Sequence, residues 1–363
     1  MNDDPLEDLA ILLPPLLQSV ETLGFIARYL DPMAVGQILA ACGTPDAALR
    51  QERARVHAWP DRLADVAQAL KGTAEETLAG FDALRAAANG QEGMGEVFRA
   101  LRYLPRALAA LYPLAQNLPP VSRLFLDPPR RDDTARLRQL AETPPRDITG
   151  VHHIDNAPGQ RGGFSLYVPE DYDPARAYPL VMALHGGSGH GSGFLWSWLR
   201  EARTYGAILA APTSMDRTWA ISGPDTDTPN LARILDFIRS RWTIDPQRLL
   251  LAGMSDGGTF AYVSGLECAS PFTHLAPTAS AFHPMMAGFA DPDRLRNLPI
   301  HITHGKLDWM FDVAMARAAA KALASAGAAA TYRELDDLAH TYPRELNAEI
   351  LAWLDGEPLV PYR

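Results

Sequence analysis

The spacing of hydrophobic positions divides the chain into two halves. In the first half, apolar residues recur every three or four positions, as in Leu78, Phe81 and Leu84, which is typical of helices packed on one face. In the second half, short apolar runs of strand character alternate with helical segments. The pattern predicts an all-helical domain over residues 1–145, followed by an α/β domain over residues 146–363.

Local signals predict where the helices of the first half begin and end. Pro14 and Pro15 predict an interruption of the first apolar segment, because proline lacks the backbone donor that a helix interior needs. The run from Thr73 to Glu76 fits a capping box and therefore predicts a helix start. A short helix is expected over residues 134–142, after a proline-rich, charged linker.

The second half is predicted to open with an antiparallel pair of strands and to continue as a mostly parallel sheet. The expected strands are residues 148–153, 164–168, 178–184, 207–211, the run before Ser255, 275–281, 298–303 and 330–335. Helices are expected at residues 231–240, 313–324 and 344–354. Such alternation covers both faces of the sheet with helices, and ligands then bind at the carboxyl ends of the strands.

One motif organises the second half. An apolar run leads directly into Gly-Met-Ser-Asp-Gly at residues 253–257, and helix-forming residues follow. In a strand–turn–helix elbow of this kind, the central Ser255 is held in an unusual backbone conformation with its hydroxyl exposed at the sheet edge. Gly253 and Gly257 are expected where any Cβ would collide with a neighbouring element. The motif predicts a nucleophilic serine.

Two later loops supply the partners that a serine nucleophile needs. Asp308 follows the strand at 298–303, and His340 follows the last strand. The chain order of nucleophile, acid and histidine is the one expected in this kind of sheet. Because the three loops share one edge, His340 is predicted to act as base for Ser255, with Asp308 orienting its imidazole.

Nearby residues offer alternatives to these assignments. Asp336 and Asp337 are close to His340 in sequence and are rivals for the acid, although such near neighbours rarely reach an imidazole of the next loop. His304 is a rival base, but it precedes Asp308 by only four residues. It is expected to support the Asp308 loop by hydrogen bonding.

A glycine-rich loop over residues 185–191 predicts an oxyanion hole. Glycines let the backbone approach a substrate carbonyl closely, and acyl transfer depends on such donors. The backbone N–H groups of Gly187 and Asp256 are the predicted donors. A phosphate-binding loop is the alternative, but no Gly-Lys-Ser/Thr ending is present.

Bulky apolar groups surround the predicted site and suggest a pocket for an apolar or aromatic part of the substrate. Aromatic side chains at strand ends can also be packing anchors of the core, so each one has a second interpretation. The predicted substrate-binding residues are His185, which also braces the glycine loop, Trp196, Trp198, Trp219, Met254, Phe282 and Trp309.

Composition narrows the partners. The net charge of −10 argues against nucleic acid, which requires a basic surface. Two cysteines, Cys42 and Cys268, make neither a disulfide framework nor a zinc site, and no metal or cofactor is expected. The N-terminus is acidic and no uninterrupted apolar run reaches the length of a membrane span, so stable membrane insertion is not expected. A cytoplasmic location is predicted.

At these positions the chain resembles the α/β-hydrolase superfamily, most closely its phospholipase/carboxylesterase and polyhydroxyalkanoate-depolymerase-like esterases. The resemblance covers roughly residues 148–356 and rests on the motifs at 184–187, 245–258, 304–308 and on His340. It implies Ser255 as nucleophile, Asp308 as acid and His340 as base. It also implies a serine carboxylic-ester hydrolase that acts through an acyl-enzyme, on small-molecule or polymeric esters including polyesters. The helical half is an addition that compact members lack.

Two other functions stay open. One is a serine peptidase or amidase with the same three residues, and the other is a non-catalytic scaffold of hydrolase fold that binds a partner. The helical half is interpreted as a cap over the site, as a surface for homodimer formation, or as a unit that simply packs. Its segment from Phe98 to Leu114 mixes basic and apolar residues, which also suits a membrane surface.

Overall fold

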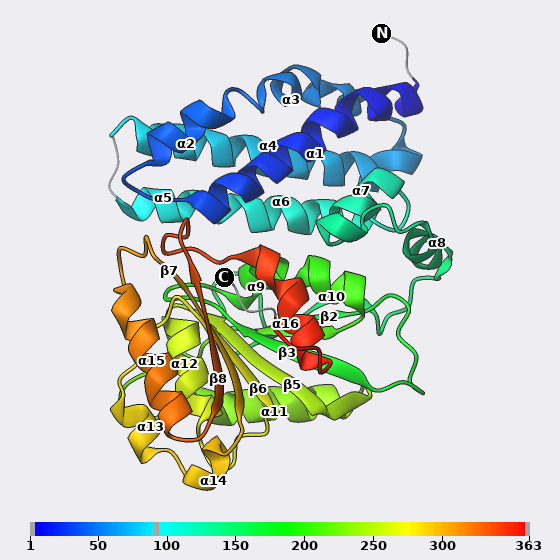
Figure 1. Cartoon of the computed structure of the whole chain (residues 1–363). Helices are drawn as coiled ribbons and strands as arrows, with labels where there is room; N and C mark the ends of the chain where they lie inside the picture. Colours follow the sequence, from blue (N-terminus) through cyan, green and yellow to red (C-terminus); the bar gives the residue numbers. More distant parts are fainter. Residues whose placement is uncertain (1–3, 91–93, 360–363) are drawn as a thin grey trace. The chain divides into compact units, whose positions relative to one another are not determined.

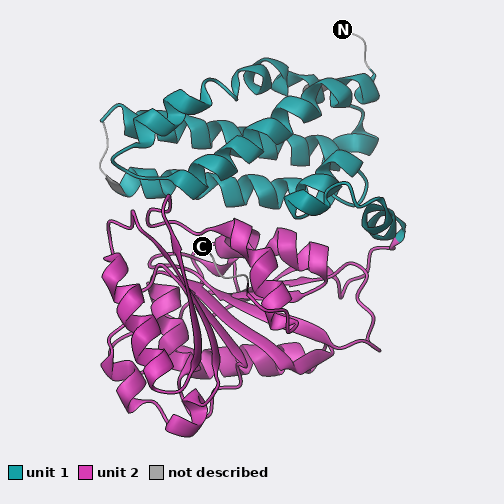
Figure 2. Ribbon diagram, viewed as in Figure 1, with its two compact units in different colours: residues 1–142 teal, residues 143–363 magenta. Residues whose placement is uncertain are grey.

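The chain folds into two compact units, residues 1–142 and residues 143–363 (Figure 2). The computed structural model describes residues 4–90 and 94–359. Met1, Asn2 and Asp3, which belong to the acidic N-terminus discussed above, lie outside the described residues.

The described residues of the first unit form helices joined by turns and loops (Figure 1). Its helices are α1 (Pro5–Tyr29), α2 (Val35–Cys42), α3 (Ala47–Glu52), α4 (Ala64–Ala88), α5 (Met94–Ala100), α6 (Tyr103–Leu111), α7 (Pro119–Leu124) and α8 (Thr134–Glu142). The long helix α4 packs against α1, α2, α5 and α6 and buries Leu70, Leu78 and Phe81. Burial of this apolar stripe explains why the helical period dominates the first half of the sequence.

The prediction that Pro14 and Pro15 interrupt the first segment is wrong. Helix α1 runs through both prolines without a break. Its inner face is buried along its whole length, from Leu12 and Leu16 to Ile26. Each large apolar side chain that is buried stabilises the fold by about 1.5–3 kcal/mol. The several buried side chains of α1 together therefore offset the cost of its two prolines, roughly 3 kcal/mol for each.

The predicted helix start at Thr73 is also wrong. Helix α4 begins nine positions earlier, at Ala64, so Thr73 lies in its interior and is fully buried. The Thr73 hydroxyl donates a hydrogen bond to the Ala69 carbonyl, at 2.7 Å, instead of capping a helix end. Threonine satisfies its hydroxyl equally well in both ways, so the local motif does not distinguish them.

Helix α1 differs from expectation in a second respect. It is long and apolar enough to cross a membrane, judged by length and composition alone. The core helix of a globular unit and a signal sequence share these properties. Isolated polar residues such as Gln18 and Glu21 interrupt the apolar run, yet the mean hydropathy of the helix stays high.

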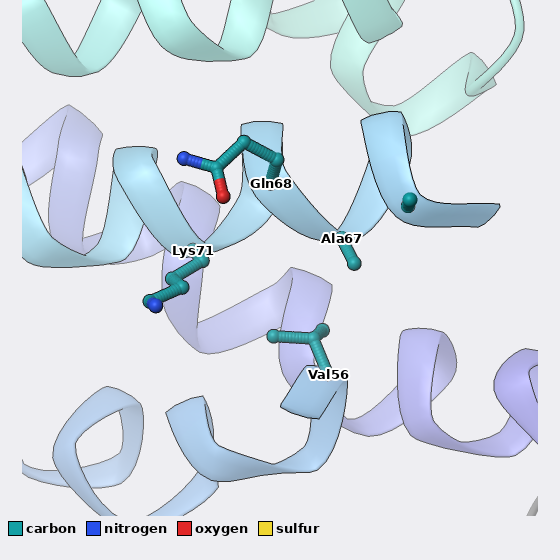
Figure 3. Close-up of a pocket in the computed structure, with 5 residues that line it drawn as sticks. Val56, Ala67, Gln68 and Lys71 are labelled. Atoms are coloured by element: carbon teal, nitrogen blue, oxygen red, sulfur yellow. The ribbon is translucent and has the colours of Figure 1, made fainter. Parts of the chain in front are cut away.

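An open pocket of the helical unit is lined by residues of α4 and by Val56. Val56, Ala64, Ala67, Gln68 and Lys71 line it, and Figure 3 shows Gln68 and Lys71 extending from the same helix. Its lining contains no serine, cysteine or histidine, so it is no candidate for the predicted chemistry.

The second unit is built on an eight-stranded sheet in the order β1-β2-β4-β3-β5-β6-β7-β8. The strands are β1 (Gly150–Ile154), β2 (Phe164–Val168), β3 (Tyr178–Leu184), β4 (Ile208–Pro212), β5 (Ile244–Met254), β6 (His274–Thr278), β7 (Pro299–Gly305) and β8 (Ala329–Leu335). Strand β2 pairs antiparallel with β1 and β4, and the strands from β4 to β8 pair in parallel. The predicted opening pair and parallel sheet are confirmed.

Helices cover the sheet on both faces (Figure 1). They are α9 (Gly191–Phe194), α10 (Leu199–Tyr205), α11 (Asp227–Arg239), α12 (Asp256–Gly265), α13 (Met285–Phe289), α14 (Pro292–Leu295), α15 (Val313–Ser325) and α16 (Asn347–Leu354). Helices α11, α12 and α15 share one core with the sheet, whereas α10 and α16 contact each other. Strands β3 and β5 are buried between these layers, which places the loops after β3, β5, β7 and β8 at one edge.

Candidate active site

Ser255 occupies the turn between β5 and α12 in a strained backbone conformation. Its φ of 57° and ψ of −123° lie in a region that residues other than glycine rarely adopt. The Ser255 N–H donates to the Thr278 carbonyl at 2.9 Å, and the Ser255 carbonyl accepts from the Thr259 N–H at 2.9 Å. The turn is thus fixed to β6 on one side and to the first turn of α12 on the other.

The two glycines of the motif permit this turn, as predicted. A Cβ on Gly253 would lie 2.3 Å from the Gly257 carbonyl oxygen, and a Cβ on Gly257 would lie 2.4 Å from the Leu184 carbonyl oxygen. Such distances are far below van der Waals contact. Only glycine therefore allows β3, β5 and α12 to approach closely enough to form the elbow.

The three side chains predicted to act together form one hydrogen-bonded row. His340 Nε2 lies 3.0 Å from Ser255 Oγ, and His340 Nδ1 lies 2.9 Å from Asp308 Oδ2. A carboxylate only accepts, so Nδ1 carries the proton and Nε2 presents a lone pair to the hydroxyl. All three side chains are buried or nearly so. This arrangement allows Ser255 to lose its proton to His340 while Asp308 stabilises the resulting cation.

Asp308 is held as an ionised acceptor. Its Oδ1 accepts hydrogen bonds from the Met310 and Phe311 N–H groups, each at 2.9 Å. Burial raises the pKa of the Asp308 carboxyl, but the hydrogen bonds from His340, Phe311 and Met310 outweigh it and lower that pKa below the usual value. The carboxylate therefore stays charged wherever the imidazole is needed as a base.

Neighbouring strands bring Asp308 and His340 together. Strands β7 and β8 pair in register up to Gly305 and Leu335, and backbone hydrogen bonds continue past their ends. The Lys306 N–H donates to the Leu335 carbonyl at 2.8 Å, and the Leu307 N–H donates to the Leu338 carbonyl at 3.0 Å. The two loops therefore start as an extension of the sheet, which the sequence order alone could only suggest.

The alternatives considered for the acid and the base have other contacts in the structure. Asp336 pairs with Lys306 Nζ at 2.9 Å on the surface, and its side chain is 83% exposed. His304 is fully buried, with Nε2 at 2.9 Å from the Phe311 carbonyl oxygen and at 3.3 Å from Asp308 Oδ2. The prediction that His304 supports the Asp308 loop is confirmed.

The glycine-rich loop after β3 passes beside the elbow. A Cβ on Gly186 would lie 3.4 Å from Ser255 Cβ, and one on Gly187 would lie 2.6 Å from Asp256 Oδ2. Asp256 is the first residue of α12, so its N–H has no partner within the helix. The loop after β3 therefore lies close to the start of α12. That the N–H groups of Gly187 and Asp256 form an oxyanion hole stays a prediction.

Several predicted substrate contacts are instead internal supports. Trp198 has no exposed surface, and Trp219 is 2% exposed, stacks on Phe260 at 5.4 Å and donates from Nε1 to the His185 carbonyl at 2.7 Å. A side chain without accessible surface cannot contact substrate, so the packing interpretation holds for both tryptophans. His185 is 2% exposed and belongs to the same internal group.

The remaining predicted contacts differ in exposure. Trp196 and Phe282 are buried, and Phe282 packs on Tyr262 at 4.7 Å. Met254 is half-buried beside the nucleophile. Trp309 is 38% exposed, and its ring lies 5.9 Å from the His340 imidazole in an edge-on arrangement. Trp309 is therefore the predicted residue best placed to meet a substrate.

Sequence reasoning missed residues that act through the backbone or through ring contacts. Phe311 lies edge-on to the His340 imidazole at 5.5 Å. Thr218, after β4, donates its hydroxyl to Asp256 Oδ2 at 2.5 Å. Arg161 donates to carbonyls of two loops near the site. Phe311 is close to Asp308 in sequence, which could have indicated its role, whereas Thr218 and Arg161 belong to no motif.

Among the described residues, no group of three or more His, Cys, Asp or Glu side chains is arranged to hold a metal ion.

His185 predicts a pH dependence of stability. Its Nδ1 donates to the Gly186 carbonyl at 2.7 Å, and its Nε2 accepts from the Ser214 N–H at 3.2 Å. Burial lowers the pKa of His185 to about 3 in the folded protein. An unfolded histidine titrates near pH 6.5, so the unfolded chain binds more protons between these values. The stabilisation is complete above about pH 6.5 and is lost as the pH falls towards 3, by about 1.4 kcal/mol per pH unit.

We therefore expect the His185→Gln variant to show a flatter decline of unfolding free energy from pH 6.5 to pH 4 than the wild type. Urea unfolding at several pH values measures this slope. The exposed His283→Gln variant controls for the loss of an imidazole as such. An unchanged slope in His185→Gln would mean that His185 is protonated in the fold.

Parts of the chain are similar to known proteins. The family described as phospholipase/carboxylesterase matches residues 227–355, which include all three members of the hydrogen-bonded row. Among curated proteins, the chain is 30% identical over 131 residues to a probable feruloyl esterase C of Aspergillus terreus, which covers 34% of this chain and 47% of that protein. It is 27% identical over 147 residues to a bifunctional acetylxylan esterase/xylanase, XynS20E, of Neocallimastix patriciarum, covering 39% of this chain and 21% of that protein. The chain thus spans less than half the length of these relatives.

Two solved structures are similar to part of this chain. A thermostable esterase aligns with a TM-score of 0.47 at 21% identity, covering 58% of this chain and 63% of that one. A ferulic acid esterase aligns with a TM-score of 0.48 at 15% identity, covering 56% of this chain and 96% of that one.

Proposed function

We propose that this chain, which belongs to the α/β-hydrolase superfamily, is a serine esterase that hydrolyses carboxylic esters through an acyl-enzyme on Ser255. The observation that carries the proposal is the continuous row from Ser255 through His340 to Asp308, with contacts of 3.0 and 2.9 Å. The matched family and the esterase relatives support the same chemistry. A serine hydroxyl is a weak nucleophile on its own, and the row supplies the base that activates it.

The reaction follows from the positions of these groups. Ser255 Oγ attacks the ester carbonyl carbon while its proton passes to His340 Nε2. The negative charge that develops on the carbonyl oxygen is received by the N–H groups of Gly187 and Asp256. His340 then gives its proton to the departing alcohol oxygen, which leaves Ser255 acylated. Water enters, loses a proton to His340 and releases the acid, and Ser255 regains its hydrogen.

The surroundings of the row favour esters with an apolar or aromatic moiety. Trp309 is partly exposed beside His340, and Met310, in the same loop, is 48% exposed. Both groups can contact a flat aromatic or aliphatic chain without presenting a charge. Aromatic acids of the feruloyl type and small acyl groups of the acetyl type, as in the names of the relatives, fall within this class.

A matched panel of substrates tests the proposal. We expect turnover of 4-nitrophenyl acetate and methyl ferulate, and no turnover of 4-nitroacetanilide above the background rate. An aliphatic polyester film in the same panel tests the predicted action on polymers. Anilide turnover comparable with that of the ester would replace the esterase by an amidase. Absence of all turnover, together with no labelling by a fluorophosphonate probe, would leave a non-catalytic scaffold.

Two further predictions belong to this proposal. The protein is predicted to be cytoplasmic. The helical unit is predicted to act in one of three ways, as a cap, as a surface for homodimer formation, or as a unit that simply packs. Cell fractionation and light scattering measure location and oligomeric state.

A further inference from the structure

The end of the β1–β2 hairpin reaches the loops that surround the predicted oxyanion hole. The Gly162 N–H donates to the Thr213 carbonyl at 3.1 Å, and the Thr213 N–H donates to the Gly163 carbonyl at 2.8 Å. These bonds extend the pairing of β2 with β4 beyond the strand ends. Arg161, the residue just before this pairing, is therefore held beside the loop that follows β4.

The Arg161 guanidinium binds two loops at once. Its Nη1 donates to the Gly189 carbonyl at 2.8 Å, in the glycine-rich loop after β3. Its Nε donates to the Asp216 carbonyl at 2.9 Å and to the Ser214 carbonyl at 3.1 Å, in the loop after β4. Its Nη2 donates to the Ser214 hydroxyl and to the Asp216 carbonyl. One planar side chain thus satisfies three carbonyls from two loops.

The same two loops interlock on both sides of Gly187. On one side, the Ser188 N–H donates to the Arg217 carbonyl at 3.1 Å. On the other side, the His185 carbonyl accepts from Trp219 Nε1 at 2.7 Å. The position of the Gly187 N–H therefore depends on how the loop after β4 is held. Arg161 is a main connection between the loop after β3 and the loop after β4.

The loop after β4 is also connected to the start of α12. Thr218 donates its hydroxyl to Asp256 Oδ2 at 2.5 Å. Asp227, at the start of α11, accepts from the Met215 N–H at 2.7 Å and from the Ala220 N–H at 2.8 Å, which fixes both ends of this loop. The two predicted oxyanion donors, Gly187 and Asp256, are thus joined through one hydrogen-bonded frame.

We infer that Arg161 is a positioning residue for the oxyanion hole, which it holds in shape by bonding the carbonyls of both loops. The inference rests on the proposed esterase function. Oxyanion donors act only if they are fixed before the charge develops, and small displacements cost much of their effect. Removal of Arg161 should therefore impair the transition state more than the binding of substrate.

Replacement of Arg161 by Met and by Lys tests this role in the full chain. Ester turnover is normalised to the active sites titrated with a fluorophosphonate. We expect Arg161→Met to lower kcat by about 10- to 100-fold with KM nearly unchanged. We also expect it to weaken binding of an aryl trifluoromethyl ketone, which adds to Ser255 as an oxyanion, by the same factor as kcat/KM. Arg161→Lys keeps the charge but not the planar fork, and should fall between wild type and Arg161→Met.

A matched control is Arg233, an arginine of α11 that contacts the same hairpin. Arg233 is exposed and donates to the Gly162 carbonyl at 3.0 Å, but reaches neither loop, so Arg233→Met should retain the wild-type kcat and inhibitor affinity. If Arg161→Met does not fold, the Lys variant gives the same two measurements. Two outcomes would overturn the inference about Arg161 and leave the proposed function standing. One is an unchanged kcat in the titrated variant, and the other is a loss of kcat/KM without a matching loss of inhibitor affinity. A wild type that does not react with the probe would overturn the proposed function and this inference with it.

Discussion

The Ser255→Ala variant is expected to lose ester hydrolysis by about four to six orders of magnitude, because no acyl-enzyme can form without Oγ. The residual rate over water would come from the N–H groups that still receive the carbonyl oxygen. The fold should be little affected, since alanine keeps the same φ of 57° with the same Cβ and gives up only the hydrogen bond to His340. Turnover of 4-nitrophenyl acetate, labelling by a fluorophosphonate probe and the melting temperature measure these effects.

Ser264 offers a matched control. It lies on α12, the helix that begins next to the nucleophile, and it is 2% exposed. Ser264→Ala should leave both labelling and turnover at the wild-type level. Activity in Ser255→Ala at the level of this control would mean that another group is the nucleophile, and the esterase mechanism proposed above would be wrong.

The Asp308→Asn variant is expected to lower kcat by about three to four orders of magnitude with little change in stability. Asp308 Oδ1 accepts two backbone N–H groups, so the amide oxygen of an asparagine would take that position. The amide nitrogen would then face His340 Nδ1 and donate to it. This reverses the tautomer, because the imidazole proton moves to Nε2 and no lone pair remains for the Ser255 hydroxyl.

Kinetics of the variant across pH measure this effect, and Asp312→Asn serves as its control. Asp312 lies four residues further on, where its side chain caps α15 by accepting from the Ala314 N–H at 2.8 Å. Asparagine caps a helix equally well, so this control should remain active. If Asp308→Asn retained a large part of the wild-type kcat, the orienting carboxylate would have to be another residue.

The sequence predicted much of the sheet and the residues at its edge for one physical reason. Strands that are buried on both faces need continuous apolar runs, and β2 and β3 were predicted with the bounds that they have in the structure. Since Ser255, Asp308 and His340 each follow such a run, their order along the chain was enough to bring them to one edge. The roles of these residues stay predictions until the variants are measured.

What the sequence did not predict depends on contacts between distant residues. The continuity of α1 through Pro14 and Pro15 depends on a buried face whose partners come from α3, α4 and α6. The burial of Trp198 and Trp219 depends on which side of each loop faces the core. Arg161 has backbone carbonyls as partners, and every residue type carries such a carbonyl, so its sequence neighbourhood contains no recognisable pattern.

Under the proposed mechanism, the left-handed backbone conformation at position 255 sets stability and activity against each other. A residue with a Cβ costs about 1–3 kcal/mol there, and glycine would remove that cost together with the hydroxyl. Selection for thermal resistance alone would therefore favour an inert variant at this turn. Stabilising substitutions should therefore leave Ser255 unchanged and be introduced at other positions.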